Sequence, residues 1–143
     1  MKIIAYTLDR HGDVLALLQR TPGVSVRDAD SRQDTARYLR RNPGLNFLAV
    51  ERGRVVGCAM CGHDGRRGYL QHVVVDPEFR RRGVAQALVE RCLAGLERRG
   101  IRKVHLFVFT ANKPAQRYWA RRGWQPRDDL FVYSLNRPAR PNA

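Results

Sequence analysis

The most constraining feature of the sequence is an apolar strand that changes into a helix through a turn rich in arginine. Residues 73–75 are three valines, Asp76 and Pro77 follow them, and three arginines lead to Gly83. Proline ends the strand because it cannot donate a hydrogen bond to a neighbouring strand. The apolar residues of 83–99 then recur at the spacing of one helix face, which predicts the longest helix of the chain.

The start of this helix has the physical character of an anion site. The first N–H groups of a helix lack intrahelical partners and carry the positive end of its macrodipole. Gly83 lets a bulky anion approach the backbone, Ala85 keeps the first turn small, and the arginines add positive charge. We therefore expect a phosphate or pyrophosphate here. The segment is neither a nucleotide P-loop, because no Gly-Lys-Ser/Thr follows, nor a GxGxxG fingerprint.

The rest of the chain alternates between strand-like and helix-like patterns. Strands are predicted at residues 3–8, 46–51, 54–62, 69–75, 103–109 and 129–135. Helices are predicted at residues 11–20, 31–41, 83–99 and 112–122. Arg52-Gly53 is a hairpin signal, and Gly100 stands where a helix commonly ends. This order predicts a mixed α/β (α+β) sandwich rather than a regular βαβ array.

The length of 143 residues and the hydrophobic fraction of 43% suit a single domain. We expect it to span residues 1–136, with 137–143 as a flexible C-terminal tail. The first residues are too few for a signal peptide, and no apolar stretch approaches the roughly 20 residues of a membrane span. These features predict a soluble, cytoplasmic protein with no membrane partner.

Three cysteines give no sign of a disulfide framework or a metal site. Cys58 and Cys61 have CxxC spacing, yet they lie in a predicted strand, where residues three apart point to opposite faces. A second CxxC or CxH that would complete a zinc site is lacking. We therefore expect these residues and Cys92 to be buried core residues in a reducing compartment, and we predict no metal.

The formal net charge of +14 leaves two interpretations open. Lys occurs only at positions 2, 103 and 113, so nearly all of the 27 basic residues are arginine. A nucleic-acid-binding domain would gather this charge on one face, whereas an arginine-rich composition would scatter it. The sequence shows neither a stacking-aromatic strand pattern nor a recognisable reading helix, which argues against specific nucleic-acid binding.

Two motifs resemble one known family. Arg80-x-x-Gly83-x-Ala85 matches the Gln/Arg-x-x-Gly-x-Gly/Ala signature of the GNAT superfamily of acyl-CoA-dependent N-acetyltransferases, and the chain looks like a small bacterial-type member. Further on, Asn112-x-x-Ala115-x-x-Tyr118-Trp119-x-x-x-Gly123-Trp124 resembles the family's second block. The resemblance covers residues 47–135. It implies a GNAT fold, with a central, mostly antiparallel sheet that splays between its fourth and fifth strands and is flanked by four helices.

The resemblance also implies acetyl-CoA as the acyl donor. Backbone groups of residues 81–86 would bind the pyrophosphate of coenzyme A, and Val73 and Val75 would pair with the pantetheine arm. An N–H of Val74 or Val75 would point at the thioester oxygen, and Asn112 would contact the pantetheine arm. The implied cofactor-binding residues are Val73, Val74, Val75, Arg80, Arg81, Arg82, Gly83, Val84, Ala85, Gln86 and Asn112.

The resemblance does not identify the catalytic acid and base. In many relatives a tyrosine protonates the leaving thiolate and a carboxylate deprotonates the amine, but this chain has Trp119 and Phe107 at these positions. The neighbouring Tyr118 is predicted to pack in the core. Three residues are candidates to accept the amine proton through water: Asp64, His72 and His105. The loop 63–68, which contains Asp64, is either part of the acceptor entrance or a plain turn.

The resemblance therefore implies transfer of an acetyl group from acetyl-CoA to a primary amine by direct attack in a ternary complex. The acceptor would be a small molecule, a peptide N-terminus or a lysine. An acyl-CoA-binding regulatory module with little or no catalysis is the first alternative, because both usual acid–base groups are missing. A basic nucleic-acid-binding domain is the second. Since family members commonly dimerise, a homodimer is an open question.

Overall fold

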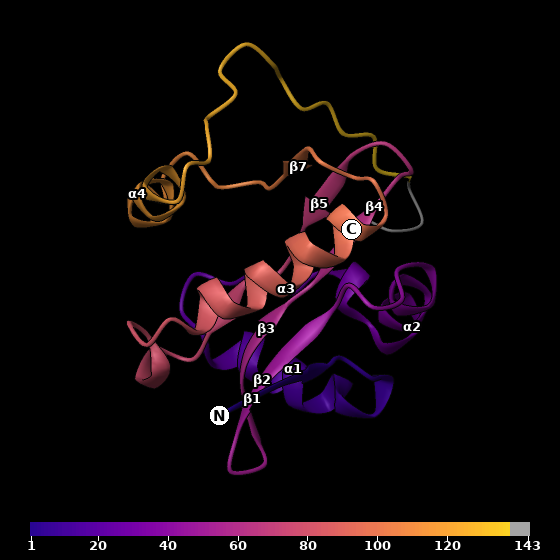
Figure 1. Ribbon diagram of the computed structural model, residues 1–143, viewed down its shortest axis with the longest axis vertical. Helices are drawn as coiled ribbons and strands as arrows, with labels where there is room; N and C mark the ends of the chain where they lie inside the picture. Colours follow the sequence, from indigo (N-terminus) through magenta and orange to yellow (C-terminus); the bar gives the residue numbers. More distant parts are fainter. Residues whose placement is uncertain (138–143) are drawn as a thin grey trace.

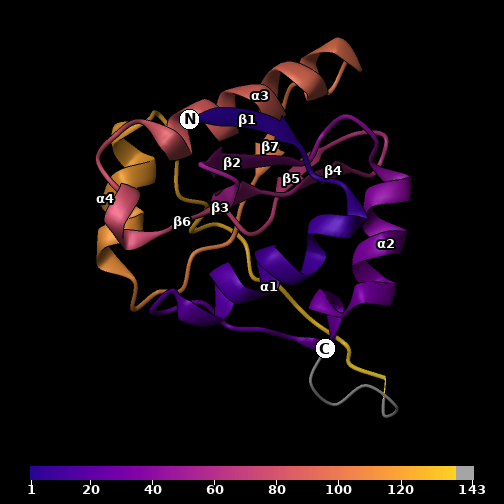
Figure 2. The same ribbon diagram turned by 90° about the horizontal axis from the view of Figure 1, so that it is seen from below.

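The computed structural model describes residues 1–137, and in it two β-sheets lie between helices (Figures 1 and 2). The first sheet has the order β1-β2-β3-β6 and the second has the order β4-β5-β7. The strands of the first sheet are β1 (Lys2–Ala5), β2 (Phe47–Glu51), β3 (Arg54–Ala59) and β6 (Val74–Val75). Those of the second are β4 (Cys61–His63), β5 (Gly68–Leu70) and β7 (Val104–His105).

The helices begin and end close to the predicted positions. They are α1 (His11–Arg20), α2 (Arg32–Arg41), α3 (Val84–Arg98) and α4 (Lys113–Arg121), with 3-10 turns η1 (Leu8–Arg10), η2 (Asp28–Asp30) and η3 (Pro77–Phe79). The Ser31 hydroxyl accepts a hydrogen bond from the Asp34 N–H at 3.2 Å and caps α2 at the start of the helix predicted over 31–41. The β2–β3 hairpin is also confirmed, because Arg52 and Gly53 both have the positive φ that its turn requires.

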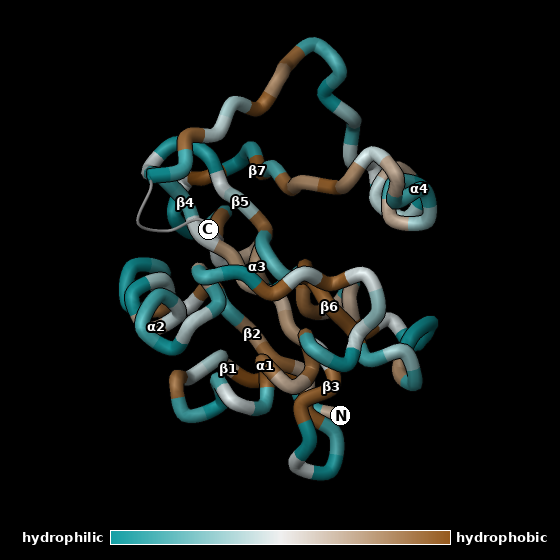
Figure 3. Tube along the Cα trace, turned by 180° about the vertical axis from the view of Figure 1, so that it is seen from behind, coloured by the Kyte–Doolittle hydropathy of each residue, from teal (hydrophilic) through white to brown (hydrophobic). Residues whose placement is uncertain are grey.

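Helices cover both faces of the first sheet (Figure 2). Phe47 and Ala49 belong to the core on the α3 side, whereas Leu48 belongs to the core on the α1 side. Alternate residues of one strand therefore separate the two cores. The hydropathy colouring shows apolar residues along β2, β3 and β6 (Figure 3). The three cysteines are buried in these cores, as expected. Cys58 lies in the α1-side core, and Cys61 and Cys92 lie in the α3-side core.

The predicted splaying of the sheet is confirmed. β5 pairs in parallel with β7 only at Gly68 with Val104 and Tyr69 with His105. After Leu70 the chain leaves the second sheet, and β6 then pairs with β3 in the first sheet. The other strand pairs are antiparallel, so the sheet arrangement is mixed and mostly antiparallel, as expected.

Several predicted strands are shorter than expected or absent. The pattern at 54–62 forms two strands that separate at Met60, and only Val104–His105 of the 103–109 prediction is a strand. No strand is assigned at residues 129–135, where Tyr133 is 92% exposed. Alternating apolar residues suit a strand, but a strand also needs a partner edge, and these residues have none within 1–137. The predicted tail lies almost wholly outside the described residues.

A membrane-spanning element is not found among the helices of residues 1–137, because none is both long enough and apolar enough.

Close packing between β3 and α3 generates the first prediction. A Cβ at Gly57 would lie 3.1 Å from both Leu88 Cδ1 and Val84 Cγ1 and 3.2 Å from Ala49 Cβ. The substitution Gly57→Ala should therefore lower the free energy of unfolding, measured with urea, by about 1–3 kcal/mol, because it forces α3 away from the sheet.

The matched control is Gly12→Ala in α1, where a Cβ would meet nothing within 4 Å. Alanine is also the better helix former, so this variant should unfold at equal or slightly higher urea concentration. Equal effects of the two substitutions would contradict the close-packing argument.

Candidate functional site

The turn between β6 and α3 has an unusual backbone. Asp76 caps η3, since its Oδ1 accepts a hydrogen bond from the Glu78 N–H at 3.0 Å. Arg81 and Gly83 then have φ angles of 62° and 75°, in the left-handed region. This region is open to glycine but costs an arginine about 1–3 kcal/mol, and such residues concentrate at functional turns.

The start of α3 presents unpaired donors to this turn. The first intrahelical bond runs from the Ala87 N–H to the Gly83 carbonyl at 3.0 Å, so the N–H groups of residues 84–86 have no acceptor within the helix. A Cβ placed on Gly83 would meet nothing within 4 Å. The side chains of Arg80, Arg81 and Arg82 are exposed beside it. Open space, unpaired N–H groups and positive charge therefore meet at one point, as a phosphate group requires.

Asp76 anchors the turn to the rest of the protein. Its carboxylate lies 3.0 Å from the Arg20 guanidinium of α1 and 3.4 Å from that of Arg54 in β3, and its side chain is 5% exposed. Burial by itself would raise the pKa of Asp76, but the Glu78 N–H and the two guanidinium groups hold the pKa below its usual range. The turn is thus tied to α1 and β3 by an ionised carboxylate.

The last two of the three valines before the turn, Val74 and Val75, form the strand β6 at an edge of the first sheet. Val74 and Val75 pair with Cys58 and Gly57 on β3, and the sheet order places β6 at the outer end. Val74 packs toward the α1-side core, whereas Val73 and Val75 pack against the α3-side core. An edge strand keeps backbone groups free for an extended ligand.

The other implied cofactor residues are held by side-chain contacts. The Gln86 Oε1 accepts a hydrogen bond from the Arg122 guanidinium of α4 at 2.7 Å, which links α4 to the start of α3. The Asn112 Oδ1 accepts a hydrogen bond from the Ala115 N–H at 3.1 Å and caps α4. Residues 73–75 and 80–86 therefore lie on one short segment of the chain, whereas Asn112 lies at the opposite end of α4 from Arg122, the residue that contacts α3.

The structure also places the aromatic residues that replace the usual acid–base groups. Trp119 packs against the α3-side core, and the half-buried Tyr118 lies edge-on to it with ring centroids 5.1 Å apart. It is therefore Trp119, rather than Tyr118, that contacts this core. Phe107 is 70% exposed and lies beyond the end of β7.

The three candidate proton acceptors have different surroundings. Asp64 is exposed, and its carboxylate accepts the backbone N–H groups of Arg66 and Arg67 at 2.8 Å, which lower its pKa. This is the geometry of a plain turn. His105 lies on β7 against the Tyr69 ring, with centroids 5.6 Å apart. The third candidate, His72, forms a hydrogen bond with a carboxylate from a distant part of the chain.

His72 pairs with an aspartate from the connection between α1 and α2. Its Nε2 lies 2.6 Å from the Asp30 Oδ1, and the His72 side chain is 24% exposed. Burial would raise the pKa of Asp30, but the His72 hydrogen bond and the Arg27 N–H keep this pKa below its ordinary value. His72 is one of the three candidates predicted from the sequence, but the sequence contains no signal for Asp30, which is 42 residues away.

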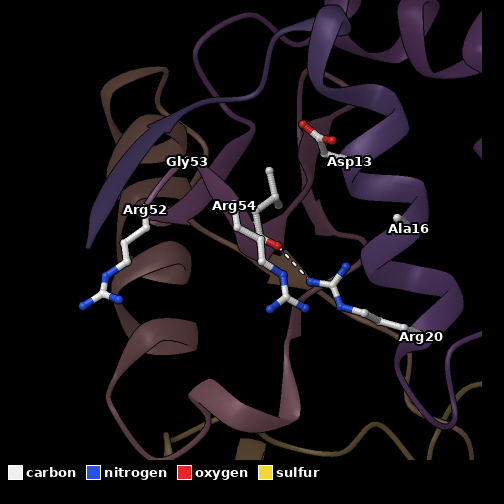
Figure 4. Close-up of a pocket in the computed structure, with 7 residues that line it drawn as sticks. Asp13, Ala16, Arg20, Arg52, Gly53 and Arg54 are labelled. Atoms are coloured by element: carbon white, nitrogen blue, oxygen red, sulfur yellow. Dashed lines mark hydrogen bonds between the residues drawn. The ribbon is translucent and has the colours of Figure 1, made fainter.

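A separate hollow of about 370 Å³ lies between α1 and the β2–β3 hairpin (Figure 4). Arg20, Arg52 and Arg54 border it, but Arg20 and Arg54 are bound to Asp76 and Arg52 points away from both. The Arg20 guanidinium also donates to the Val55 carbonyl at 3.0 Å. These arginines therefore support the turn rather than form a second anion site. Within residues 1–137, no three His, Cys, Asp or Glu side chains are grouped as metal ligands.

Comparison with known proteins identifies the family of this chain. The model of the Acetyltransferase (GNAT) family matches residues 12–124. An acetyltransferase of Pectobacterium atrosepticum is 42% identical over 79 residues, which make up 55% of this chain and 56% of that relative. An acetyltransferase of Sodalis glossinidius is 30% identical over 132 residues, 92% of each chain. The chain belongs to the GNAT family and is an acyl-CoA-dependent acetyltransferase.

Two solved structures show the same fold. AAC(6')-Iy, in complex with the bisubstrate analogue CoA-S-monomethyl-acetylneamine, has a TM-score of 0.73 at 22% identity and covers 94% of this chain and 97% of its own. The ribosomal-protein-S18-alanine N-acetyltransferase of Escherichia coli has a TM-score of 0.69 at 22% identity and covers 85% of this chain and 76% of its own. The GNAT fold predicted from the sequence is confirmed.

The anchoring role of Asp76 generates a prediction about stability. The substitution Asp76→Asn should lower the free energy of unfolding by about 1–3 kcal/mol at neutral pH, since it leaves two arginines without their buried acceptor. Because the pKa of Asp76 is lower in the folded protein than in the unfolded chain, the carboxylate stabilises the fold in full above about pH 5. This contribution should be lost as the pH falls through the lowered pKa.

Urea unfolding between pH 7 and pH 2.5 measures the difference between wild type and variant. The control is Asp129→Asn, which removes an exposed carboxylate paired with Arg127 at 3.1 Å and should have no measurable effect. A difference between wild type and Asp76→Asn that stays constant down to pH 2.5 would show that Asp76 is not the anchor.

Proposed function

We propose that the protein transfers the acetyl group of acetyl-CoA to a primary amine by direct attack in a ternary complex. The observation that carries this proposal is the left-handed turn at Arg81 and Gly83, which opens onto the unpaired N–H groups of α3. Such a turn suits a pyrophosphate, and family membership supplies the reason why that pyrophosphate belongs to coenzyme A.

The cofactor would lie along the turn and the edge of β6. The N–H groups of residues 81–86 would hold the pyrophosphate, and Arg80, Arg81 and Arg82 would supply positive charge around it. The free edge of Val73, Val74 and Val75 would pair with the pantetheine arm, with an N–H of Val74 or Val75 toward the thioester oxygen. Val84 and Ala85 complete the first turn of α3, Gln86 joins it to α4, and Asn112 would approach the arm from the cap of α4.

Direct transfer is favoured because the thiols are poorly placed to carry an acetyl group. All three cysteines are buried. Burial raises the pKa of the Cys58 thiol to about 12, and a hydrogen bond with Cys61 together with burial raises the pKa of Cys92. A thiolate is the nucleophilic form, so these thiols remain unreactive near neutral pH.

The acceptor class is inferred from what related folds act on. One neighbour is held with an analogue that joins CoA to acetylneamine, and the other is named for the alanine of a ribosomal protein. The first name joins CoA to a small molecule, and the second describes N-acetylation of a protein. We therefore propose a small-molecule or peptide amine as acceptor.

Calorimetry with acetyl-CoA tests the cofactor site. Wild type should bind acetyl-CoA, whereas Gly83→Glu should weaken binding at least about tenfold, or about 1.4 kcal/mol, because a carboxylate would stand where the pyrophosphate binds. ATP serves as a comparison ligand and should bind weakly to both proteins.

The matched control is Gly100→Glu at the opposite end of α3. Gly100 also has a positive φ, 79°, and a Cβ there would likewise meet nothing within 4 Å. The two variants therefore share the same backbone strain and the same change of charge. Equal loss of acetyl-CoA affinity in both would contradict the site, and tight binding without turnover of any amine would indicate an acyl-CoA-binding module instead.

Steady-state kinetics test the order of chemical steps. Direct attack requires acetyl-CoA and amine to be bound together, so double-reciprocal plots at varied concentrations of both should intersect. Labelled CoA should not exchange into acetyl-CoA when the amine is absent. Parallel lines together with such exchange would show an acetylated enzyme and contradict direct transfer.

A further inference from the structure

The hydrogen bond between His72 and Asp30 joins the segment between β5 and β6 to the connection between α1 and α2, close to the proposed position of the thioester. His72 belongs to residues 71–73, where the chain leaves β5 and has not yet entered β6. The Gln71 N–H still donates to the Met60 carbonyl at 2.7 Å, and Val74 already pairs with β3. His72 therefore stands where the sheet splays, two residues before a valine proposed to contact the thioester.

The hydrogen bond with Asp30 fixes the tautomer of the neutral imidazole ring. A carboxylate only accepts hydrogen bonds, and Asp30 is held ionised, so the Nε2 of His72 must donate its proton to the Asp30 Oδ1. In the neutral ring the lone pair is then on Nδ1. A ring held in this way by a carboxylate has one nitrogen fixed as donor and the other available as a base.

The aspartate is itself held in place from several elements. The His11 Nε2 of α1 donates to the Asp30 backbone carbonyl at 2.8 Å, and the Arg27 N–H donates to the Asp30 Oδ2 at 2.8 Å. Tyr6 and Cys58 also interact electrostatically with Asp30, and burial raises the pKa of both. Asp30 is thus the group in this cluster that carries a negative charge.

Resting on the proposed function, we propose that His72 is the base that accepts the amine proton and that Asp30 is its positioning residue. The ammonium group of the acceptor gives one proton to Nδ1, which turns the neutral ring into an imidazolium ion. The amine nitrogen then forms a bond to the acetyl carbon while the carbon–sulfur bond breaks. The electron pair of that bond leaves with the sulfur, which takes the second amine proton.

This assignment also sets the side from which the acceptor arrives. Asp30 lies in η2, between α1 and α2, so the positioning residue belongs to the part of the chain that precedes β2. The base His72 and the cofactor turn both belong to the later segment that leads from β5 to α3. The hollow beside the β2–β3 hairpin is bordered by neither His72 nor Asp30 and is not the acceptor site in this assignment.

The test compares His72→Gln with wild type, using neamine and alaninamide as acceptors. The glutamine amide keeps a donor for Asp30 but lacks a basic nitrogen. We expect kcat to fall by about 10²- to 10⁴-fold, the usual contribution of a general base, while calorimetric affinity for acetyl-CoA stays within about twofold. The residual activity should rise with pH as more of the amine is deprotonated in solution.

Three further variants separate a catalytic role from a structural one. Asp30→Asn should lower kcat, and the double variant should be no slower than His72→Gln alone, because both changes disable one unit. His105→Gln, on β7, is the matched control and should keep wild-type kcat.

Three results would overturn the inference. The first is His72→Gln with kcat within about threefold of wild type, and the second is multiplicative losses in the double variant. The third is a wild type that binds acetyl-CoA but acetylates neither probe, which leaves the cofactor site standing and removes the role of His72. Failure of wild type to bind acetyl-CoA would instead overturn the proposed function and this inference with it.

Discussion

The site depends on the short turn that connects β6 to α3. Only eight residues, 76–83, separate the strand from the helix, and two of them adopt left-handed backbone. This turn is stable because a buried Asp76 carboxylate binds arginines from α1 and β3 at one end and α3 packs on the sheet at the other. The helix start thereby stays open, with its N–H groups and dipole directed at solvent. A ligand that carries phosphate groups is the natural complement of this arrangement.

The site also depends on the splaying of the sheet, which makes β6 an edge strand. β5 stays with β7, while β6 crosses to β3 and becomes an edge. An edge with free backbone groups can pair with an extended arm, and the adjacent turn can hold its charged end. His72 stands at the crossing point, and its bond to Asp30 connects the cofactor side to the connection between α1 and α2. One segment of the chain therefore carries, in order, the proposed base His72, the edge strand β6 and the anion site at the start of α3.

Much of this could be predicted because the signals are local. Neighbouring residues determine the helices predicted at 11–20, 31–41 and 112–122, the Arg52-Gly53 hairpin and the turn before α3. Strand pairing depends on distant partners, which explains the errors at 103–109 and 129–135. The His72–Asp30 pair was beyond prediction for the same reason: no spacing rule relates residues 42 positions apart. Asp64 and His105 carried equally good local arguments, and only the fold separates the three.

The most direct test of the central claim is backbone hydrogen exchange with and without acetyl-CoA. The N–H groups of residues 83–86 lack helical partners and should exchange quickly in the free protein. The account predicts that acetyl-CoA slows exchange at residues 83–86 and at 73–75, with little change at the far end of α3. Saturating acetyl-CoA that leaves both segments unprotected, or protects the β2–β3 hairpin instead, would contradict it.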